Sequence, residues 1–95
     1  MLTIKRHYID TVEEALIHAP EEAPTIALRA ELLAAIRTGV ESWRLPPAEA
    51  AHRLAISRGK LDAILKNRIN MFSLDTLVML APRVGVEVRM EVTRR

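Results

Sequence analysis

Residues 47–64 read PAEAAHRLAISRGKLDAI, and this stretch decides the fold. It holds two short segments in which apolar residues recur at helical spacing. These residues are Ala50, Ala51 and Leu54 in the first segment, and Leu61 and Ile64 in the second, which continues to Leu65. The small Ala50 and Ala51 allow a second helix to cross closely, and residues 55–57 supply a tight turn, a buried anchor and a helix N-cap. The pattern predicts a helix-turn-helix, whose second helix is shaped to enter the major groove of DNA.

The composition favours one small domain with a thin core. The chain has 95 residues, of which 49% are hydrophobic and only three are aromatic, so aliphatic side chains must build the core. Cysteine is absent, which excludes disulfides and thiolate chemistry. No apolar run approaches ~18 residues, and residues 1–10 lack the apolar segment of a signal peptide. We therefore expect a soluble, cytoplasmic protein without a membrane partner.

Charge is distributed unevenly along the chain. The net charge is only +2. Residues 10–31 carry six acidic side chains against Arg29 alone, whereas residues 52–70 carry five basic side chains against Asp62 alone. The basic block coincides with the predicted helix pair, as expected for a surface that faces phosphates. Two ordinary solvated faces are the alternative interpretation.

The chain before the central stretch is expected to hold an arm, a short helix and one long helix. Residues 1–9 fit a short strand or an ordered arm, and residues 11–19 fit an acidic helix that Pro20 ends. Thr25 is a good N-cap for a helix through about residue 43. Its inward face is expected to consist of Ile26, Leu32, Leu33, Ile36, Val40 and Trp43. Gly39 inside this helix costs about 1 kcal/mol relative to alanine, which points to close packing.

A further helix is expected after the central stretch. Asn67 can end the preceding helix in a left-handed conformation, and Ser73 can cap the new one. Pro82 falls near its end, where it forces a kink or a stop, and Gly85 fits the C-cap. The inward side chains are expected to be Leu74, Leu77, Val78 and Leu80 or Ala81.

The tail changes to the two-residue period of a half-buried strand. Its apolar face consists of Val86, Val88, Met90 and Val92. Such a strand needs a partner, either residues 2–8 of the same chain or the same strand of a second subunit. We favour the second subunit, so these four residues are the expected interface of a homodimer.

The residues resemble a known family. PAEAAHRLAIS at 47–57 is similar to the helix-turn-helix of XRE (Cro/cI-like) regulators, the phage-repressor kind. More narrowly, RAELLAAI at 29–36 and FSLDTLVMLAPRVGVEVRMEV at 72–92 resemble the HigA-like antitoxin branch, which is marked by an FSLD helix start and a C-terminal amphipathic strand. The chain differs from these relatives at Pro47, where glutamine is usual, at Ala55, where glycine is usual, and at Arg58-Gly59, where Gln-Pro or Gln-Gln is frequent.

The resemblance implies a fold and a function. The expected fold is mainly α, a five-helix lambda-repressor-like domain with a C-terminal β-strand used in dimerisation. It divides into an arm with a short helix (1–24), a helix-turn-helix domain (25–85) and a strand with a basic tail (86–95). The implied function is an antitoxin that represses its own operon and neutralises a RelE/HigB-like ribonuclease toxin. Its expected partners are a palindromic DNA operator, a second copy of the chain and the toxin.

The predicted DNA contacts gather at the second helix of the pair, because its N-terminal end meets base edges. Arg58 can engage guanine O6 and N7 together, and Ala63, expected on the exposed side beside Lys60, can touch a thymine methyl. Asp62 can accept from cytosine N4 or disfavour wrong sites. The complete set is Ser57, Arg58, Gly59, Lys60, Asp62, Ala63, Lys66, Asn67 and Arg68, with His52 from the preceding helix. For each single residue, a solvated surface position is the alternative.

Other classes of protein fit the sequence less well. His7, His18 and His52 are scattered without the spacing of a metal site, and no glycine-rich phosphate loop exists. We therefore expect no catalysis, no cofactor and no metal. Two alternatives remain: a free-standing or prophage regulator, and a protein-interaction module that has kept the fold and lost DNA binding.

Overall fold

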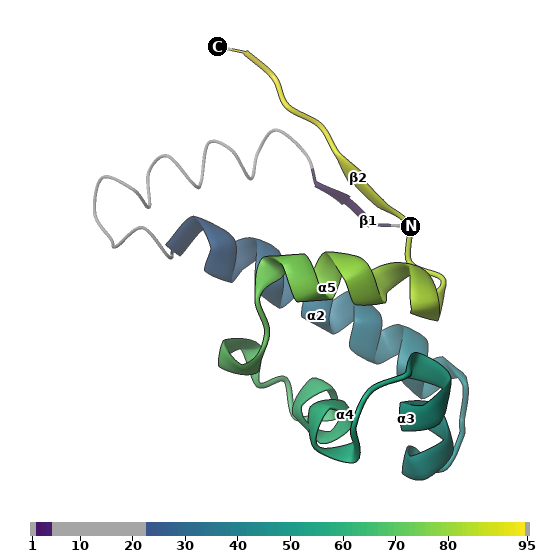
Figure 1. The fold of residues 1–95 in the computed structure, drawn as a ribbon. Coiled ribbons are helices and arrows are strands. Elements are labelled where there is room, and N and C mark those ends of the chain that lie inside the picture. The colour runs from purple at the N-terminus through teal and green to yellow at the C-terminus, as the bar shows by residue number, and fades with distance from the viewer. Residues whose placement is uncertain (1, 5–22, 95) are drawn as a thin grey trace.

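A computed structural model describes residues 2–4 and 23–94. Within them the chain is mainly helical, with four α-helices, two short 3-10 helices and two short strands (Figure 1). In chain order the elements are β1 (Leu2–Ile4), α2 (Ala23–Ser42), α3 (Pro47–Leu54), α4 (Arg58–Leu65), η1 (Ile69–Met71), α5 (Leu74–Leu80), η2 (Ala81–Val84) and β2 (Val88–Met90). The predicted acidic helix at 11–19 lies outside the described residues.

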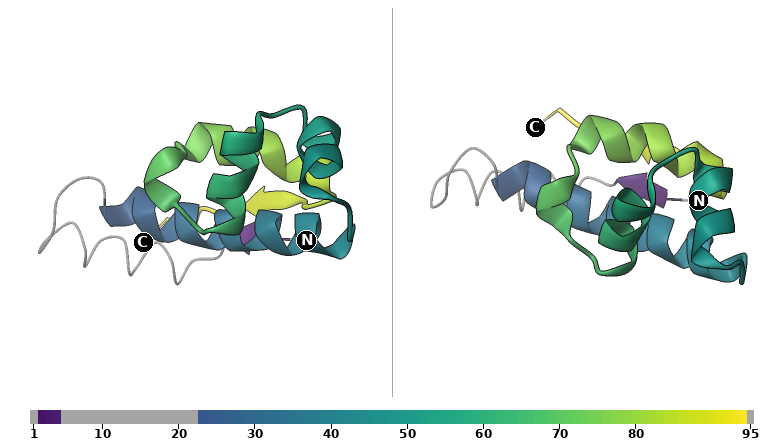
Figure 2. Two further views of the ribbon diagram at one scale, coloured as in Figure 1. Left: turned by 90° about the horizontal axis from the view of Figure 1, so that it is seen from below. Right: turned by 60° about the horizontal axis from the view of Figure 1, so that its bottom comes forward.

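The long helix α2 is the central helix of the domain, and the other helices pack along one side of it (Figures 1 and 2). It begins at Ala23, so Thr25 lies in its first turn and the prediction of Thr25 as N-cap is wrong. Pro24 explains the earlier start, because a proline lacks the N–H that the first turn leaves unpaired. Ile26 was expected to face inward, but it is 41% exposed. In Figure 1 the N-terminal end of α2 extends beyond helix α5.

The core is one aliphatic cluster to which all four helices contribute, together with Phe72. Its members are Leu32, Leu33, Ile36, Val40, Ala50, Ala51, Leu54, Leu61, Ala63, Ile64, Phe72, Leu77, Leu80 and Ala81. The predicted spacing in α3 and α4 is confirmed, because Ala50, Ala51 and Leu54 pack with Leu61 and Ile64. Trp43 and Leu65 are half-buried against this cluster.

The helix α5 has a narrower buried stripe than expected. Ser73 caps it, accepting a hydrogen bond from the Thr76 N–H at 3.1 Å, as predicted. Leu77, Leu80 and Ala81 fill the inward positions at i, i+3 and i+4. Val78 lies at the edge of this stripe and is 41% exposed, so the prediction that it faces inward is wrong.

The two strands pair within the chain, which was the less favoured alternative. β1 and β2 form a parallel two-stranded sheet in the register Leu2↔Val88, Thr3↔Arg89 and Ile4↔Met90. The strand β2 covers only residues 88–90, so it is shorter than the alternating pattern at 86–92. Val86 and Val88 are half-buried against the core, whereas Met90 and Val92 are 63% and 78% exposed. The apolar face of the tail therefore continues past the core of its own chain.

The glycine at position 39 fits a close contact between α2 and η2. A Cβ built on Gly39 would lie 3.0 Å from the Val84 Cβ and 3.1 Å from the Val84 carbonyl oxygen. A backbone carbonyl cannot move aside without shifting η2. The close packing expected around this residue is confirmed.

Gly39→Ala should therefore destabilise the domain by about 1–3 kcal/mol, because the clash outweighs the gain in helix propensity. Gly59→Ala is the matched control, since a Cβ there meets only the Ser57 hydroxyl at 3.9 Å. It should leave stability unchanged or raise it by up to about 1 kcal/mol. Urea denaturation of the two variants measures both effects. Equal stability of the two variants would contradict the close contact.

Candidate nucleic-acid interface

The helices α3 and α4 are joined by a turn built from residues 55–57. Pro47 occupies the first turn of α3 as predicted, and Ala55 ends the helix in the left-handed region at φ 57° and ψ 44°. For a residue with a Cβ this conformation costs about 1–2 kcal/mol. The Ile56 N–H donates to the Ala51 carbonyl oxygen at 3.0 Å. The usual glycine can thus be replaced by alanine without loss of the tight turn.

The C-terminal end of α3 is also tied to η2. The Arg83 Nη1 donates to the Leu54 carbonyl oxygen at 2.8 Å. Leu54 directly precedes the left-handed Ala55, so Arg83 stabilises a carbonyl at the helix end, where a cation is favoured. No pattern in the sequence predicts this contact, because the two residues are 29 positions apart.

The second helix of the pair begins with a well-formed cap. The Ser57 Oγ accepts from the Lys60 N–H at 3.1 Å, which confirms the N-cap prediction. After the cap, Arg58, Gly59 and Lys60 form the first turn of α4, and all three are exposed. The N-terminal end of α4 is therefore accessible to a ligand.

Nine of the ten predicted DNA-contact residues are exposed, and one is not. The exposed residues are His52, Ser57, Arg58, Gly59, Lys60, Asp62, Lys66, Asn67 and Arg68. Ala63 is only 2% exposed and belongs to the core, so its predicted contact with a thymine methyl is wrong. The physical reason is that α4 packs against α3, α2 and η1 together, which buries a wide sector of the helix.

Both lysines in this set, Lys60 and Lys66, have partners inside the protein. The Lys60 ammonium donates to the Met71 carbonyl oxygen at 3.2 Å and lies 5.3 Å from the centre of the Phe72 ring. Lys66 forms an ion pair with Asp62 at 3.1 Å, with both side chains more than half exposed. Exposed pairs of this kind are weak and open readily. Within the described residues, the side chains of Arg58 and Arg68 have no such partner.

The end of α4 follows the prediction. Asn67 adopts the left-handed conformation at φ 59°, and the Arg68 N–H donates to the Ala63 carbonyl oxygen at 2.9 Å. This turn directs the chain into η1, so that Arg68 and Asn70 lie just past the helix. Both are exposed.

One cationic side chain near the helix pair was not predicted as a contact. The Arg53 guanidinium stacks on the Trp43 ring at 4.1 Å, which links the exposed side of α3 to the end of α2. The four-residue connector 43–46 between α2 and α3 is the only signal in the sequence that brings these residues together.

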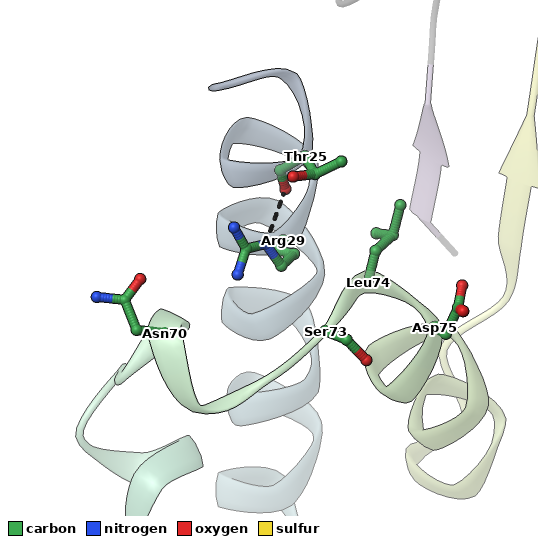
Figure 3. Close-up of a pocket in the computed structure, with 6 residues that line it drawn as sticks. All are labelled: Thr25, Arg29, Asn70, Ser73, Leu74 and Asp75. Carbon is green, nitrogen blue, oxygen red and sulfur yellow. Dashed lines mark hydrogen bonds between the residues drawn. The ribbon is translucent and has the colours of Figure 1, made fainter. Parts of the chain in front are cut away.

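A groove of about 510 Å³ opens between the first turns of α2 and the segment from η1 to α5. Figure 3 shows that Arg29 and Asn70 lie on one side of it, with Ser73, Leu74 and Asp75 on the other. The Arg29 guanidinium is held by two backbone carbonyls, of Thr25 at 3.3 Å and Phe72 at 3.2 Å. Arg29 therefore fixes the segment before α5 against α2.

The described part of the chain contains no candidate metal site and no candidate membrane-spanning helix. Among residues 2–4 and 23–94, no cluster of three or more His, Cys, Asp or Glu side chains could hold a metal ion. None of the described helices combines the length and apolarity needed to cross a membrane.

The geometry as a whole defines a helix-turn-helix domain: a capped second helix with its N-terminal end exposed, held on a helical scaffold. A family model described as a helix-turn-helix domain matches residues 18–93, and the chain belongs to that family. Comparisons with curated proteins and with solved structures gave no match. Fold and family together indicate a DNA-binding regulator.

Proposed function

We propose that the protein is a sequence-specific transcriptional repressor that reads the major groove with the N-terminal end of α4. The observation that carries the proposal is the first turn of this helix, where Arg58 is exposed and unpaired among the described residues. Gly59 beside it has no side chain, and a Cβ there would meet only the Ser57 hydroxyl oxygen at 3.9 Å, which permits close approach of the helix to a base edge or phosphate.

The exposed residues around α4 divide into readers and positioning contacts. Arg58 is the direct reader, because its planar fork matches guanine O6 and N7. Ser57 and Asn67 lie at the two ends of the helix, and Lys66 and Arg68 add positive charge at its C-terminal end. These four residues, with His52, bind phosphates and set the register, whereas Asp62 disfavours wrong base pairs.

The finer proposal is that this repressor is the antitoxin of a type II toxin–antitoxin pair. It rests on the resemblance of residues 29–36, 47–57 and 72–92 to the HigA-like branch. The surplus of acidic side chains in residues 10–31 is complementary to a basic toxin, because opposite potentials steer association. Catalysis is not part of the proposal.

A gel shift on the protein's own promoter, with and without the adjacent gene product, tests both levels. A shift at low salt supports the repressor. Formation of a complex with a small basic neighbouring protein supports the antitoxin, and a shift without such a complex favours a free-standing or prophage regulator. If the folded protein does not shift the promoter, the result favours a protein-interaction module of the same fold.

The phosphate contacts predict a change in salt dependence. Lys66→Ala and Arg68→Ala should each reduce the slope of log K against log salt by about 0.9, the value for one lost phosphate contact on duplex DNA. Fluorescence anisotropy at several salt concentrations measures the slope. Asp75→Asn on α5 is the control, since this exposed side chain lies outside the proposed contact set and should leave the slope unchanged. Unchanged slopes for both cationic variants would remove them from the interface.

A further inference from the structure

The strand β2 is paired along only one edge among the described residues. β1 occupies that edge, and the sheet has no third described strand. The other edge presents unpaired backbone groups beside the exposed side chains of Met90 and Val92. An apolar, unpaired edge of this kind is a template for another strand.

We infer that β2 pairs antiparallel with β2 of a second copy, with the two-fold axis midway between the two Met90 residues. The inference rests on the repressor of the proposed function and on the homodimer expected from the sequence, and it specifies the interface of that dimer. The result is a four-stranded sheet in the order β1–β2–β2–β1, in which each Met90 lies opposite its own copy.

Side-chain parity limits the possible registers. In a symmetric antiparallel pair, opposite residues point to the same face, so one residue must lie opposite its own copy, with the axis midway between the two. An axis at Arg89 places arginine opposite arginine and Glu87 opposite Glu91, and an axis at Glu91 places glutamate opposite glutamate. Like charges directly opposite each other are destabilising, which disfavours these two registers.

The turn before β2 disfavours an axis at Val88. That register would place the partner's Glu91 opposite Gly85, whose backbone is left-handed at φ 76° and cannot continue a ladder. The Val86 N–H is moreover bonded to the Ala81 carbonyl oxygen at 2.9 Å. Pairing must therefore begin after Val86, at the C-terminal side of the turn.

The axis at Met90 gives favourable side-chain pairs on both faces of the strand. On the charged face, Arg89 lies opposite the partner's Glu91, twice by symmetry, and next to its own Glu87, with which it already forms an ion pair at 3.0 Å. On the apolar face, Val88 lies opposite the partner's Val92. Val88 is half-buried at the core, so the partner's Val92 would be covered beside it.

Single cysteine variants test the register, because the chain contains no native cysteine. Under mild oxidation Met90→Cys should form the disulfide dimer fastest, since only residue 90 lies opposite its own copy. Arg89→Cys is offset by two residues, about 7–8 Å, and Val88→Cys by four, about 13 Å, so both should react far more slowly. Faster linkage at 88 or 89 would overturn the register.

Charge exchange provides an independent test. Arg89→Glu and Glu91→Arg should each weaken the dimer about tenfold or more, because each creates two like-charge pairs. The double variant should recover most of the affinity, as measured by sedimentation. Failure of the double variant to recover would contradict the Arg89–Glu91 pairs.

The mass of the wild-type protein separates this inference from the proposed DNA binding. A monomer at all concentrations overturns the interface, even if the promoter gel shift is positive. A dimer that links through Met90→Cys but shifts no DNA would support the interface and eliminate the repressor.

Discussion

Ala63→Lys is expected to destabilise the domain by at least about 3 kcal/mol, because a long cationic side chain must enter a filled apolar site. Ala63 is 2% exposed and belongs to the core cluster that unites α4 with the rest of the fold. Small domains are stable by only about 5–15 kcal/mol, so the loss is a large share of the total. Urea denaturation measures it directly.

Asp62→Lys is the matched control, because it places the same side chain one residue earlier on the exposed side of α4. Losing the exposed ion pair with Lys66 should change stability by no more than about 1 kcal/mol. The added charge should tighten binding to any DNA and increase its salt dependence. The reverse result, a stable variant at position 63 and an unfolded one at 62, would mean that α4 presents a different face.

Arg58→Ala is expected to weaken binding to the operator by about 1–3 kcal/mol and to relax preference at one base pair. The residue has a free guanidinium at the exposed start of α4, and its loss removes no hydrogen bond or ion pair within the described residues. Stability should therefore remain unchanged, which separates this prediction from the one for Ala63. Binding to a panel of operator variants measures the preference.

The role of Arg58 is decided by comparing the loss of affinity for the operator with the loss of affinity for random DNA. A base reader should lose much more affinity for the operator than for a scrambled sequence. An equal loss on both would show a phosphate contact alone. Lys60→Met gives a useful contrast: this ammonium bonds the Met71 carbonyl, so its removal should lower stability as well as binding.

The scaffold of the helix pair could be predicted because local rules determine it. Pro47 in the first turn, Ser57 as N-cap, Asn67 in the left-handed region and Gly85 at a C-cap each follow from the conformational preference of one residue. The buried positions of α3 and α4 follow from helical spacing alone. These parts of the fold need no knowledge of the rest of the chain.

The errors arise where several elements meet. Ile26 and Val78 fit an inward stripe by spacing, but their exposure depends on where neighbouring helices begin and end. Ala63 is buried because three elements pack on α4 together. A pattern within one helix carries no information on how wide its covered sector is.

Contacts between residues far apart in the chain could not be predicted from the sequence either. Arg83 reaches the Leu54 carbonyl, and Arg29 reaches the Phe72 carbonyl across 43 positions. The pairing of β2 with residues 2–4 was one of two alternatives that the alternating pattern could not separate. Such contacts form only in the assembled fold. They shape the site, but no pattern in the sequence predicts them.

Protection of guanine N7 from methylation in the promoter complex tests the central claim most directly, because N7 lies in the major groove where α4 is proposed to bind. The proposed dimer predicts two groups of protected guanines about ten base pairs apart, or a multiple of that distance, lost together in Arg58→Ala. A complex of the same affinity without N7 protection would contradict major-groove reading by α4.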